Sequence, residues 1–441
     1  MNKILTVSLI NYPKDKLFTT FRWLVLAGLL FVAINLNDPH LLAYRQFETP
    51  ALLIMAASGI AFYFRRPDNL NRTVGLSVLL ATIVLVVLGE YSFHFRKNLV
   101  LNEIDETTLQ LGEHFIVGYH KVEELKPLVS KGLVAGIFVT QRNVEGKSSQ
   151  DFRNEIHELQ QLRKNARLPP LIVTTDQEGG IVSRLSPPLT RTPPLASILN
   201  SQLTKAELRA KAEAYGREQG QALTGLGITV NFSPVVDLKN DRAGNRLDFH
   251  SLINQRAISG DPAMTTEVAL AYIRGLESQG VKGTLKHFPG LGGVTNDTHH
   301  FSAKLGTAVS DLEARDWLPF KQIAKDTDAL IMLSHVILTA IDSKNPVSFS
   351  KAVVQRIIRD SWQHNGVLVT DDLTMGAAYN EGLCRATLKA LNAGVDLLLI
   401  SYDYEKFYEA MHCARRAYAM GQLDRRMAAL SHQRMVRLFE R

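Results

Sequence analysis

The segment from Lys286 to His300, KHFPGLGGVTNDTHH, combines a lysine, three histidines, an aspartate and three glycines. Asp297 and His299 stand two residues apart, and a carboxylate beside an imidazole favours the protonated ring. Such a histidine could donate a proton near neutral pH and recover one from water later. The glycines would let the segment fold over a site and move. The segment therefore predicts a proton carrier on a loop that follows Lys286 and His287.

A pair of adjacent carboxylates, Asp371 and Asp372, follows an apolar run further along the chain. Cleavage of a glycosidic bond needs a carboxylate that stabilises or traps an oxocarbenium-like centre, and an acid that protonates the leaving oxygen. Either aspartate could be the first group, and Asp297 with His299 could supply the second. Asp372 could equally cap a helix. For the acid, His300 and Glu178 are the next candidates.

Eight short apolar runs after Lys97 alternate with helix-like sequence, and these elements must position the reactive groups. Apolar runs of this kind, separated by helices, are typical of parallel strands buried on both faces. We therefore expect an α/β fold, a (β/α)8 TIM-type barrel, in which Thr204 and Ser350 cap the helices 204–223 and 350–365. The runs cover residues 113–120, 134–141, 170–176, 228–234, 281–287, 329–335, 366–372 and 395–401.

Polar side chains stand where several of these runs end. Active sites of (β/α)8 barrels lie at the carboxyl ends of the strands, so we expect these residues to form one functional site. Two of them have structural alternatives, since Lys286 could be an ion-pair partner and His335 a buried core histidine. The residues are Asp176, Asn231, Ser233, Lys286, His287, His335, Asp371 and Asp372.

The first 97 residues predict a membrane region with three transmembrane helices at about 18–36, 49–64 and 73–89. Buried helices of a soluble domain are the alternative. Lysines and arginines gather before the first run and between the second and third, which places those flanks in the cytoplasm. The third span would then lead outward. We expect a linker at 98–110 and a catalytic barrel at 111–441, on the periplasmic or extracellular side of a bacterial inner membrane.

Composition excludes other classes of function. The net charge is +7, but residues 1–97 hold ten Lys and Arg against five Asp and Glu, so the remainder is nearly neutral. Without a basic stripe on the main domain, we expect no nucleic-acid partner. Cys384 and Cys413 are the two cysteines, and no Cys-x-x-Cys or Cys/His cluster occurs. We expect no metal site and no cofactor. The cysteines could be buried thiols, or a disulfide in an oxidising compartment.

The ordered motifs resemble glycoside hydrolase family 3, and most of all its single-barrel bacterial β-N-acetylhexosaminidase branch. The resemblance covers roughly Leu111 to Arg441 and not the membrane region. It rests on TDQEGG (175–180), VNFSPVVDL (230–238), KHFPGLG (286–292), DTH (297–299), SHV (334–336) and TDDLTMGA (370–377).

The resemblance implies a retaining mechanism through a covalent glycosyl-enzyme. It makes Asp371 the nucleophile, His299 the acid/base and Asp297 the residue that orients His299. For substrate binding it implies Asp176, Arg184, Arg256, Lys286 and His287, to which we add His335 from the strand ends.

The resulting hypothesis is a membrane-anchored exo-β-N-acetylglucosaminidase that acts on terminal β-linked GlcNAc in peptidoglycan or related glycans. Its partners would be that carbohydrate and the lipid bilayer. A phosphorylase or β-glucosidase of the same family is one alternative, because a histidine acid/base leaves less negative charge near an attacking phosphate. An inactive glycan-binding membrane protein is the other.

Overall fold

The computed structural model describes residues 14–65, 70–240, 252–294 and 303–440, and the chain divides into two units. The first unit is Met1–Arg96 and the second is Lys97–Arg441. We describe each unit by itself.

The N-terminal unit consists of helices that pack on one another through an apolar seam. They are α1 (Lys14–Ile34), the 3-10 helix η1 (Pro39–Tyr44), α2 (Arg45–Phe64) and α3 (Leu70–Asn102), which runs on into the second unit. Leu29 of α1, Ala56 of α2 and Leu79 of α3 belong to one buried cluster. Gly75 of α3 faces the ring of Tyr63, where any larger residue would collide with it. Small residues at such contacts let helices approach closely.

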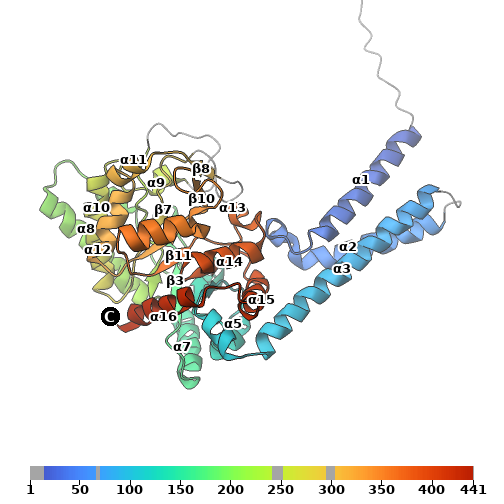
Figure 1. Ribbon diagram of the computed structural model, residues 1–441, viewed down its shortest axis with the longest axis horizontal. Helices are drawn as coiled ribbons and strands as arrows, with labels where there is room; N and C mark the ends of the chain where they lie inside the picture. Colours follow the sequence, from blue (N-terminus) through green and yellow to red (C-terminus); the bar gives the residue numbers. More distant parts are fainter. Residues whose placement is uncertain (1–13, 66–69, 241–251, 295–302, 441) are drawn as a thin grey trace, which may run out of the picture. The chain divides into compact units, whose positions relative to one another are not determined.

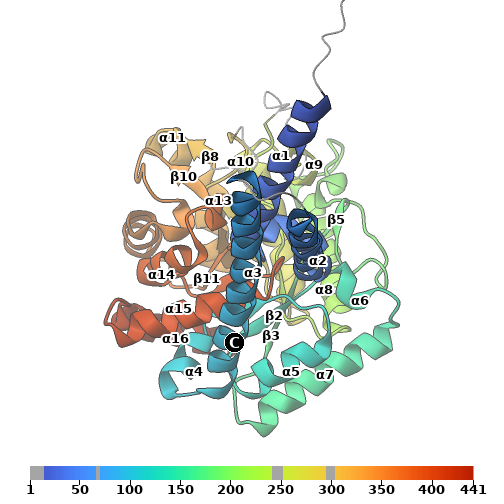
Figure 2. The ribbon, with the colours of Figure 1, turned by 90° about the vertical axis from the view of Figure 1, so that its right-hand side faces the viewer.

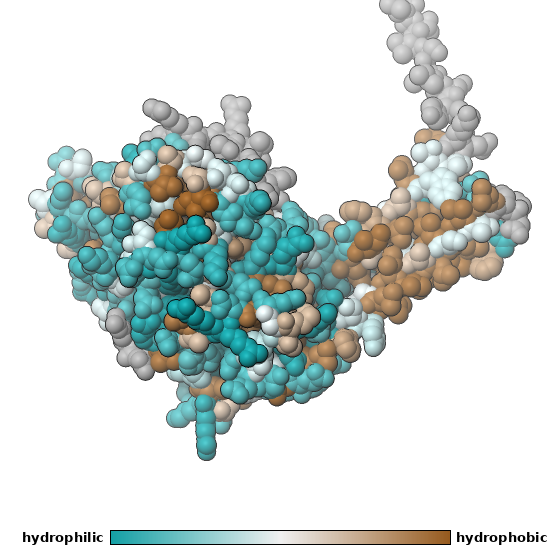
Figure 3. All heavy atoms as spheres, in the orientation of Figure 1, coloured by the Kyte–Doolittle hydropathy of each residue, from teal (hydrophilic) through white to brown (hydrophobic). Residues whose placement is uncertain are grey.

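The outer faces of these helices are apolar as well. Leu24, Phe31 and Ile54 are exposed by 66%, 65% and 65%, and Figure 3 shows hydrophobic side chains covering this unit. Three stretches are long and apolar enough to cross a membrane: Leu17–Ile34, Pro39–Phe64 and Leu70–Asn102. The predicted spans 49–64 and 73–89 lie within the second and third stretches, and the predicted span 18–36 overlaps the first but ends two residues beyond it. The helices are longer than the runs, because a helix can continue into polar sequence where hydropathy has already fallen.

The second unit is a TIM-barrel-like α/β fold built on parallel strands (Figure 1). One sheet has the order β12-β1-β2-β3-β6 and another the order β11-β9-β7. Isolated parallel bridges continue the pairing between them, from Val230 to Lys282 and from Val369 to Leu397. Each strand lies within, or one residue beyond, a predicted apolar run. The strands are β1 (Phe115–Val117), β2 (Gly136–Val139), β3 (Ile172–Thr175), β6 (Val230–Asn231), β7 (Thr284–Phe288), β9 (Leu330–Leu333), β11 (Leu368–Thr370) and β12 (Leu398–Ile400).

Helices follow the strands in sequence and cover them. The helices α5 and α7 lie side by side, as Figure 2 shows. The helices α8 and α10 approach so closely that a side chain at Gly216 or Gly275 would strike the opposite backbone. The main helices are α5 (Val122–Ser130), α7 (Ser149–Asn165), α8 (Lys205–Thr224), α10 (Pro262–Glu277), α12 (Trp317–Asp326), the π-type helix η4 (Ala352–Ser361), α14 (Leu383–Ala393), α15 (Lys406–Ala419) and α16 (Arg425–Glu440).

Short elements complete the unit. They are α4 (Glu106–Gly112), α6 (Gln141–Val144), α9 (Ile253–Arg256), α11 (Val309–Ala314), α13 (Gly376–Tyr379), the 3-10 helices η2 (Leu195–Ile198) and η3 (Val347–Phe349), and the strands β4 (Gln177–Gly179), β5 (Val182–Ser183), β8 (Ala303–Leu305) and β10 (Val336–Leu338). Strands β4 and β5 form an antiparallel pair, and β8 and β10 a parallel one.

The helix caps and the linker that the sequence predicts can be compared with the structure. Thr204 caps α8, because its hydroxyl accepts from the amide of Glu207, whose carboxylate accepts in return from the amide of Thr204. Ser350 accepts from the amide of Val353 at the start of the turn that becomes η4. Residues 98–110, expected as a linker, hold the end of α3 and most of α4.

The two cysteines are joined. Cys384 of α14 and Cys413 of α15 form a disulfide, with Cα atoms 5.5 Å apart. Of the two readings that the sequence left open, the structure has the disulfide.

Candidate active site

A buried lysine joins two carboxylates close to the end of β3. Lys286 is 2% exposed, and its Nζ lies 2.6 Å from Oδ1 of Asp176 and 2.7 Å from Oε1 of Glu178. Asp176 directly follows β3, and Asn231 holds this turn by exchanging two hydrogen bonds with the backbone of Gln177. The pairing of β7 with β9 is irregular between Leu285 and Phe288. Such an irregularity re-aims side chains next to a site.

Glu178 also forms an ion pair with Arg256, which extends the network of charged side chains around Lys286. Nε and Nη2 of Arg256 donate to the two carboxylate oxygens of Glu178 at 2.9 and 2.7 Å. Burial alone would raise the pKa of Glu178, but Arg256 and Lys286 outweigh it and lower the pKa to about 2. The same pairing outweighs burial at Arg256 and raises the pKa of its guanidinium. Glu178 therefore remains ionised at every working pH, which makes it a poor proton donor.

Hydrogen bonds to Asp237 hold His287 in place. Oδ2 of Asp237 lies 2.7 Å from Nδ1 of His287 and also accepts from its backbone amide at 3.1 Å. Its other oxygen accepts from the amide of Leu291 at 2.7 Å. With Nδ1 engaged in this way, the remaining nitrogen, Nε2, lies 3.5 Å from Nη2 of Arg256. Asp237 thus sets the direction in which His287 presents its ring.

The two adjacent aspartates after β11 have different environments. Asp372 is buried, and its carboxylate accepts from Thr374, Ser401 and Tyr402. These bonds tie the end of β11 to the end of β12. Asp371 is only half-buried, and its Oδ1 accepts from the amide of Asp372 at 2.9 Å. Asp371 is therefore the more accessible of the two carboxylates, and Asp372 is the one held by several donors.

Both ring nitrogens of His335 lie within hydrogen-bond distance of protein groups. It is 1% exposed. Its Nδ1 lies 2.8 Å from Oγ of Ser348, and its Nε2 lies 2.9 Å from the carbonyl oxygen of Asp372. Burial lowers the pKa of the ring, against the opposing charge of Asp371. A neutral imidazole that donates from Nε2 to the carbonyl would support the Asp371–Asp372 turn, a positioning role in place of the predicted sugar contact.

The remaining predicted residues are only partly accounted for. Arg184 is exposed, and its backbone amide donates to the carbonyl of Asp176 at 3.1 Å, so it stands next to the network. Asp297, His299 and His300 lie outside the described residues. Among the residues that are described, the structure brings together Asp176, Lys286, His287 and Arg256.

Two residues of the site were missed as such by the sequence analysis, namely Glu178 as an ion-pair hub and Asp237 as a histidine partner. Both lie inside the quoted motifs TDQEGG and VNFSPVVDL. Asp237 offers a signal that could have been used, since it is an acidic residue in an otherwise apolar run and such a residue is rarely buried without a partner.

The ring of charged and hydrogen-bonding groups, with a carboxylate at a strand end, is suited to binding and cleaving a polyhydroxylated molecule. A family model, the glycosyl hydrolase family 3 N terminal domain, matches residues 103–438. The chain is therefore a glycoside hydrolase. Within that class, it belongs to glycosyl hydrolase family 3.

Individual relatives agree with the family. The chain is 34% identical over 291 residues to a protein named beta-hexosaminidase from Nitrosomonas eutropha, covering 65% of this chain and 79% of that one. It is 32% identical over 304 residues to a beta-hexosaminidase from Tolumonas auensis, covering 68% and 82%.

Solved structures show the same fold. A family 3 β-N-acetylglucosaminidase from Paenibacillus sp. FPU-7 has a TM-score of 0.69 at 27% identity, with 76% of this chain aligned to 62% of that one. A family 3 glycosyl hydrolase from Mycobacterium smegmatis has a TM-score of 0.66 at 27% identity, covering 77% and 98%.

Proposed function

We propose that this chain is a membrane-anchored, retaining β-N-acetylglucosaminidase that removes terminal β-linked GlcNAc from a glycan. The relatives named beta-hexosaminidase and the solved β-N-acetylglucosaminidase support the substrate. The observation that carries the proposal is an ionic network in which Lys286 joins Asp176 to Glu178 and Glu178 joins Lys286 to Arg256. This network fixes charged groups that can hold sugar hydroxyls.

The proposed reaction has two displacements. Asp371 attacks the anomeric carbon while His299 protonates the leaving oxygen, and a glycosyl-aspartate forms. Water then attacks the same carbon, and His299 takes the proton from it, which frees Asp371. Asp297 stabilises the imidazolium form between the two steps. Asp176, Arg184, Arg256, Lys286 and His287 bind the sugar, and His335 positions the turn that carries Asp371.

We propose further that the parallel strands form a complete (β/α)8 ring. The bridges at Val230–Lys282 and Val369–Leu397 support this, since they link the ends of the two sheets. In a closed ring the strand ends that bear Asp176, Lys286 and Asp371 face a common centre.

The catalytic unit is proposed to act outside the cytoplasm, anchored in a bacterial inner membrane. Two observations support this side. Lysines and arginines flank the first apolar stretch and precede the third. The disulfide between Cys384 and Cys413 suits an oxidising compartment. On that side the enzyme would meet peptidoglycan, its fragments or other glycans that contain GlcNAc.

The test is an activity assay of the full chain in lipid nanodiscs. Chromogenic β-GlcNAc and β-glucoside substrates are compared, each with and without phosphate. The proposal expects hydrolysis of the β-GlcNAc substrate, with free GlcNAc as the product in both buffers. A sugar phosphate as the main product would make the chain a phosphorylase, and a preference for glucoside would overturn the substrate. No turnover of either substrate would favour a binding protein.

A further inference from the structure

A cavity lies at the opposite ends of the strands from the candidate active site. It has a volume of about 240 Å³ and is bordered by residues that precede β1, β2 and β3, together with α4, α7 and α16. Its walls are mostly aliphatic, with Leu168, Met435 and Val436 among them. No step of the proposed reaction involves a residue that lines this cavity.

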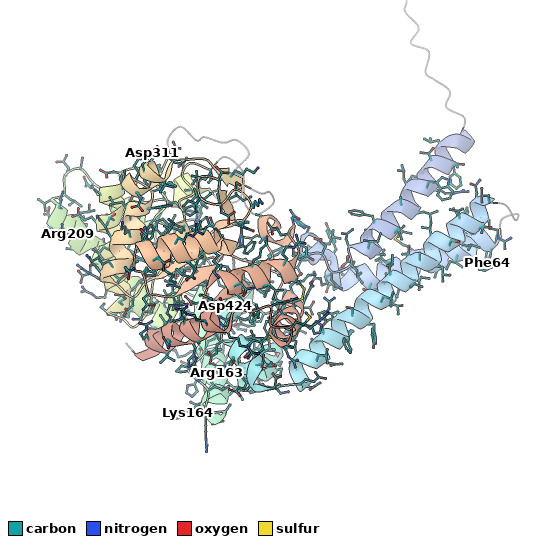
Figure 4. All side chains as sticks on the ribbon, in the orientation of Figure 1. Phe64, Arg163, Lys164, Arg209, Asp311 and Asp424 are labelled. Atoms are coloured by element: carbon teal, nitrogen blue, oxygen red, sulfur yellow. A yellow bond between two sulfur atoms is a disulfide. The ribbon has the colours of Figure 1, made fainter. Side chains whose placement is uncertain are left out.

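The basic side chain of Arg163 in α7 lines the cavity and is 5% exposed. Figure 4 marks its position on the helix. Its Nε donates to the carbonyl of Pro169 at 2.8 Å and its Nη1 to that of Val134 at 3.0 Å. Within the part of the chain that the structure describes, its Nη2 makes no hydrogen bond, and no carboxylate lies within 4.0 Å of the guanidinium.

The guanidinium is therefore buried with no ion pair among the described residues, although the charge of Glu113 acts on it from beyond 4.0 Å. Burial lowers the pKa of Arg163 to about 10, so the group remains charged at neutral pH. The acidic residue of the cavity, Glu113, is engaged elsewhere, since its Oε2 lies 2.6 Å from Nδ1 of His432. Two carbonyl bonds and the charge of Glu113 compensate the guanidinium only in part. A partly compensated buried charge is costly, which makes an anion that reaches Nη2 favourable.

The mouth of the cavity is apolar. Leu109 of α4 and Val436 of α16 are 37% and 38% exposed, although both are large hydrophobic residues. An exposed apolar rim around a concave, mostly aliphatic space is typical of a ligand site. Together with Arg163 it defines a ligand that is apolar at one end and anionic at the other.

We propose that this cavity binds a compact apolar monocarboxylate, whose carboxylate pairs with Arg163 and whose hydrocarbon part fills the aliphatic walls. A cavity of about 150 Å³ holds benzene. By proportion, this one would hold roughly ten non-hydrogen atoms. For a ligand of that size we expect a dissociation constant on the order of 0.1 mM.

The test uses three probes of nearly equal shape: 3-phenylpropanoate, 3-phenylpropan-1-ol and 3-phenylpropylamine. Each is titrated calorimetrically into the full chain in lipid nanodiscs, and the heat measured with empty nanodiscs is subtracted. We expect the acid to bind at least about tenfold more tightly than the alcohol, and the amine not to bind, because a charge-assisted bond is worth more than a neutral one. Equal binding of acid and alcohol, or no binding of the acid, would overturn the proposal.

Variants then locate the binding site. Leu109→Glu puts a like charge at the mouth without touching the core and should weaken 3-phenylpropanoate roughly tenfold. The matched control is Met420→Glu, which changes an exposed apolar residue outside the cavity and should have no effect. Arg163→Gln should abolish the advantage of the acid over the alcohol. If Arg163→Gln fails to fold, Leu109→Glu still decides, and unchanged affinity in that variant would show that the acid binds elsewhere.

Discussion

Glu178 and Arg256 are 78 residues apart in the chain and meet in a two-point ion pair, with Nε to Oε2 at 2.9 Å and Nη2 to Oε1 at 2.7 Å. The oxygen that receives Nη2 also lies 2.7 Å from Nζ of Lys286. One carboxylate therefore holds in place two cations that come from different elements. The candidate sugar site depends on this residue although Glu178 itself is 6% exposed.

Replacing Glu178 by glutamine should destabilise the catalytic unit and raise KM. Removing one partner from a buried ion pair costs about 3–5 kcal/mol, because the remaining charges stay buried. Thermal unfolding and kinetics of the full chain in nanodiscs measure the two effects. The control is Glu213→Gln in the exposed pair with Arg217, which should cost less than about 1 kcal/mol. A Glu178→Gln variant as stable as the wild type at pH 7 would contradict the role of the pair.

The same carboxylate predicts how stability depends on pH. Its pKa is about 2 in the folded chain against 4.5 as the ordinary value. The folded state therefore binds the proton less readily than the unfolded state, and the stabilisation is fully present above about pH 4.5 and is lost as the pH falls toward 2. Unfolding curves of the wild type and of Glu178→Gln, recorded across this interval, should converge at its acid end. Parallel curves would show that another group is responsible.

Substitutions of the two aspartates after β11 should have different effects, one on the reaction rate and the other on stability. Asp371→Asn should lower kcat by roughly 10³-fold or more while the fold persists. Asp372→Asn should lower the unfolding free energy by about 1–3 kcal/mol, because several donors lose a charged acceptor. A fluorinated GlcNAc substrate followed by peptide mapping should label Asp371 in the wild type. A label on Asp372 would reverse the assignment.

His299 is expected to carry the proton. His299→Ala should lose about 10²–10⁴-fold in rate on substrates with poor leaving groups, and far less on an activated aryl glycoside, whose oxygen needs little protonation. His300→Ala is the matched control and should retain both activities. Asp297→Asn should move the basic limb of the pH–rate profile to lower pH, because the imidazolium loses its carboxylate. Wild-type rates for His299→Ala on both substrates would eliminate the dyad.

Reporter fusions test the side of the membrane. Alkaline phosphatase joined after Lys97 should be active, and green fluorescent protein at the same place should be dark, if the catalytic unit lies outside the cytoplasm. Fusions within residues 66–69, between the second and third apolar stretches, should give the opposite pattern. A fluorescent fusion after Lys97 would place the enzyme in the cytoplasm and remove intact cell wall as a substrate.

The eight strands of the two larger sheets could be predicted because each is short and fully buried and lies in or beside a mostly apolar run. The β3 strand, Ile172–Thr175, lies inside the run 170–176, and its four residues are all buried. The cap at Thr204 was equally predictable, since a capping box is local. Such features depend on neighbours within a few residues, which the sequence displays directly.

The partners inside the site could not be predicted in the same way. Nothing near Asp237 in sequence shows that it will hold His287, 50 residues further on. His335 was expected to contact substrate because it ends a run, yet its ring turns to Ser348 and to the carbonyl of Asp372. Which side of a strand end faces the centre depends on tertiary pairing. Helix α3 likewise continues to Asn102, beyond the predicted span 73–89. Its last turns contain polar residues, so an apolar run does not reveal where the helix ends.

The hydrogen bonds of Asp372 have a consequence for engineering. The carboxylate of Asp372 binds Thr374, Ser401 and Tyr402, and the backbone amide of Leu373 donates to the carbonyl of Leu399. Because these bonds do not involve residue 371, that residue can be made small without undoing the turn. Asp371→Gly would leave a vacant space of carboxylate size beside the anomeric carbon, which an external anion such as azide or formate could occupy. With an α-glycosyl fluoride as donor, such a variant would build β-linked oligosaccharides that it can no longer degrade.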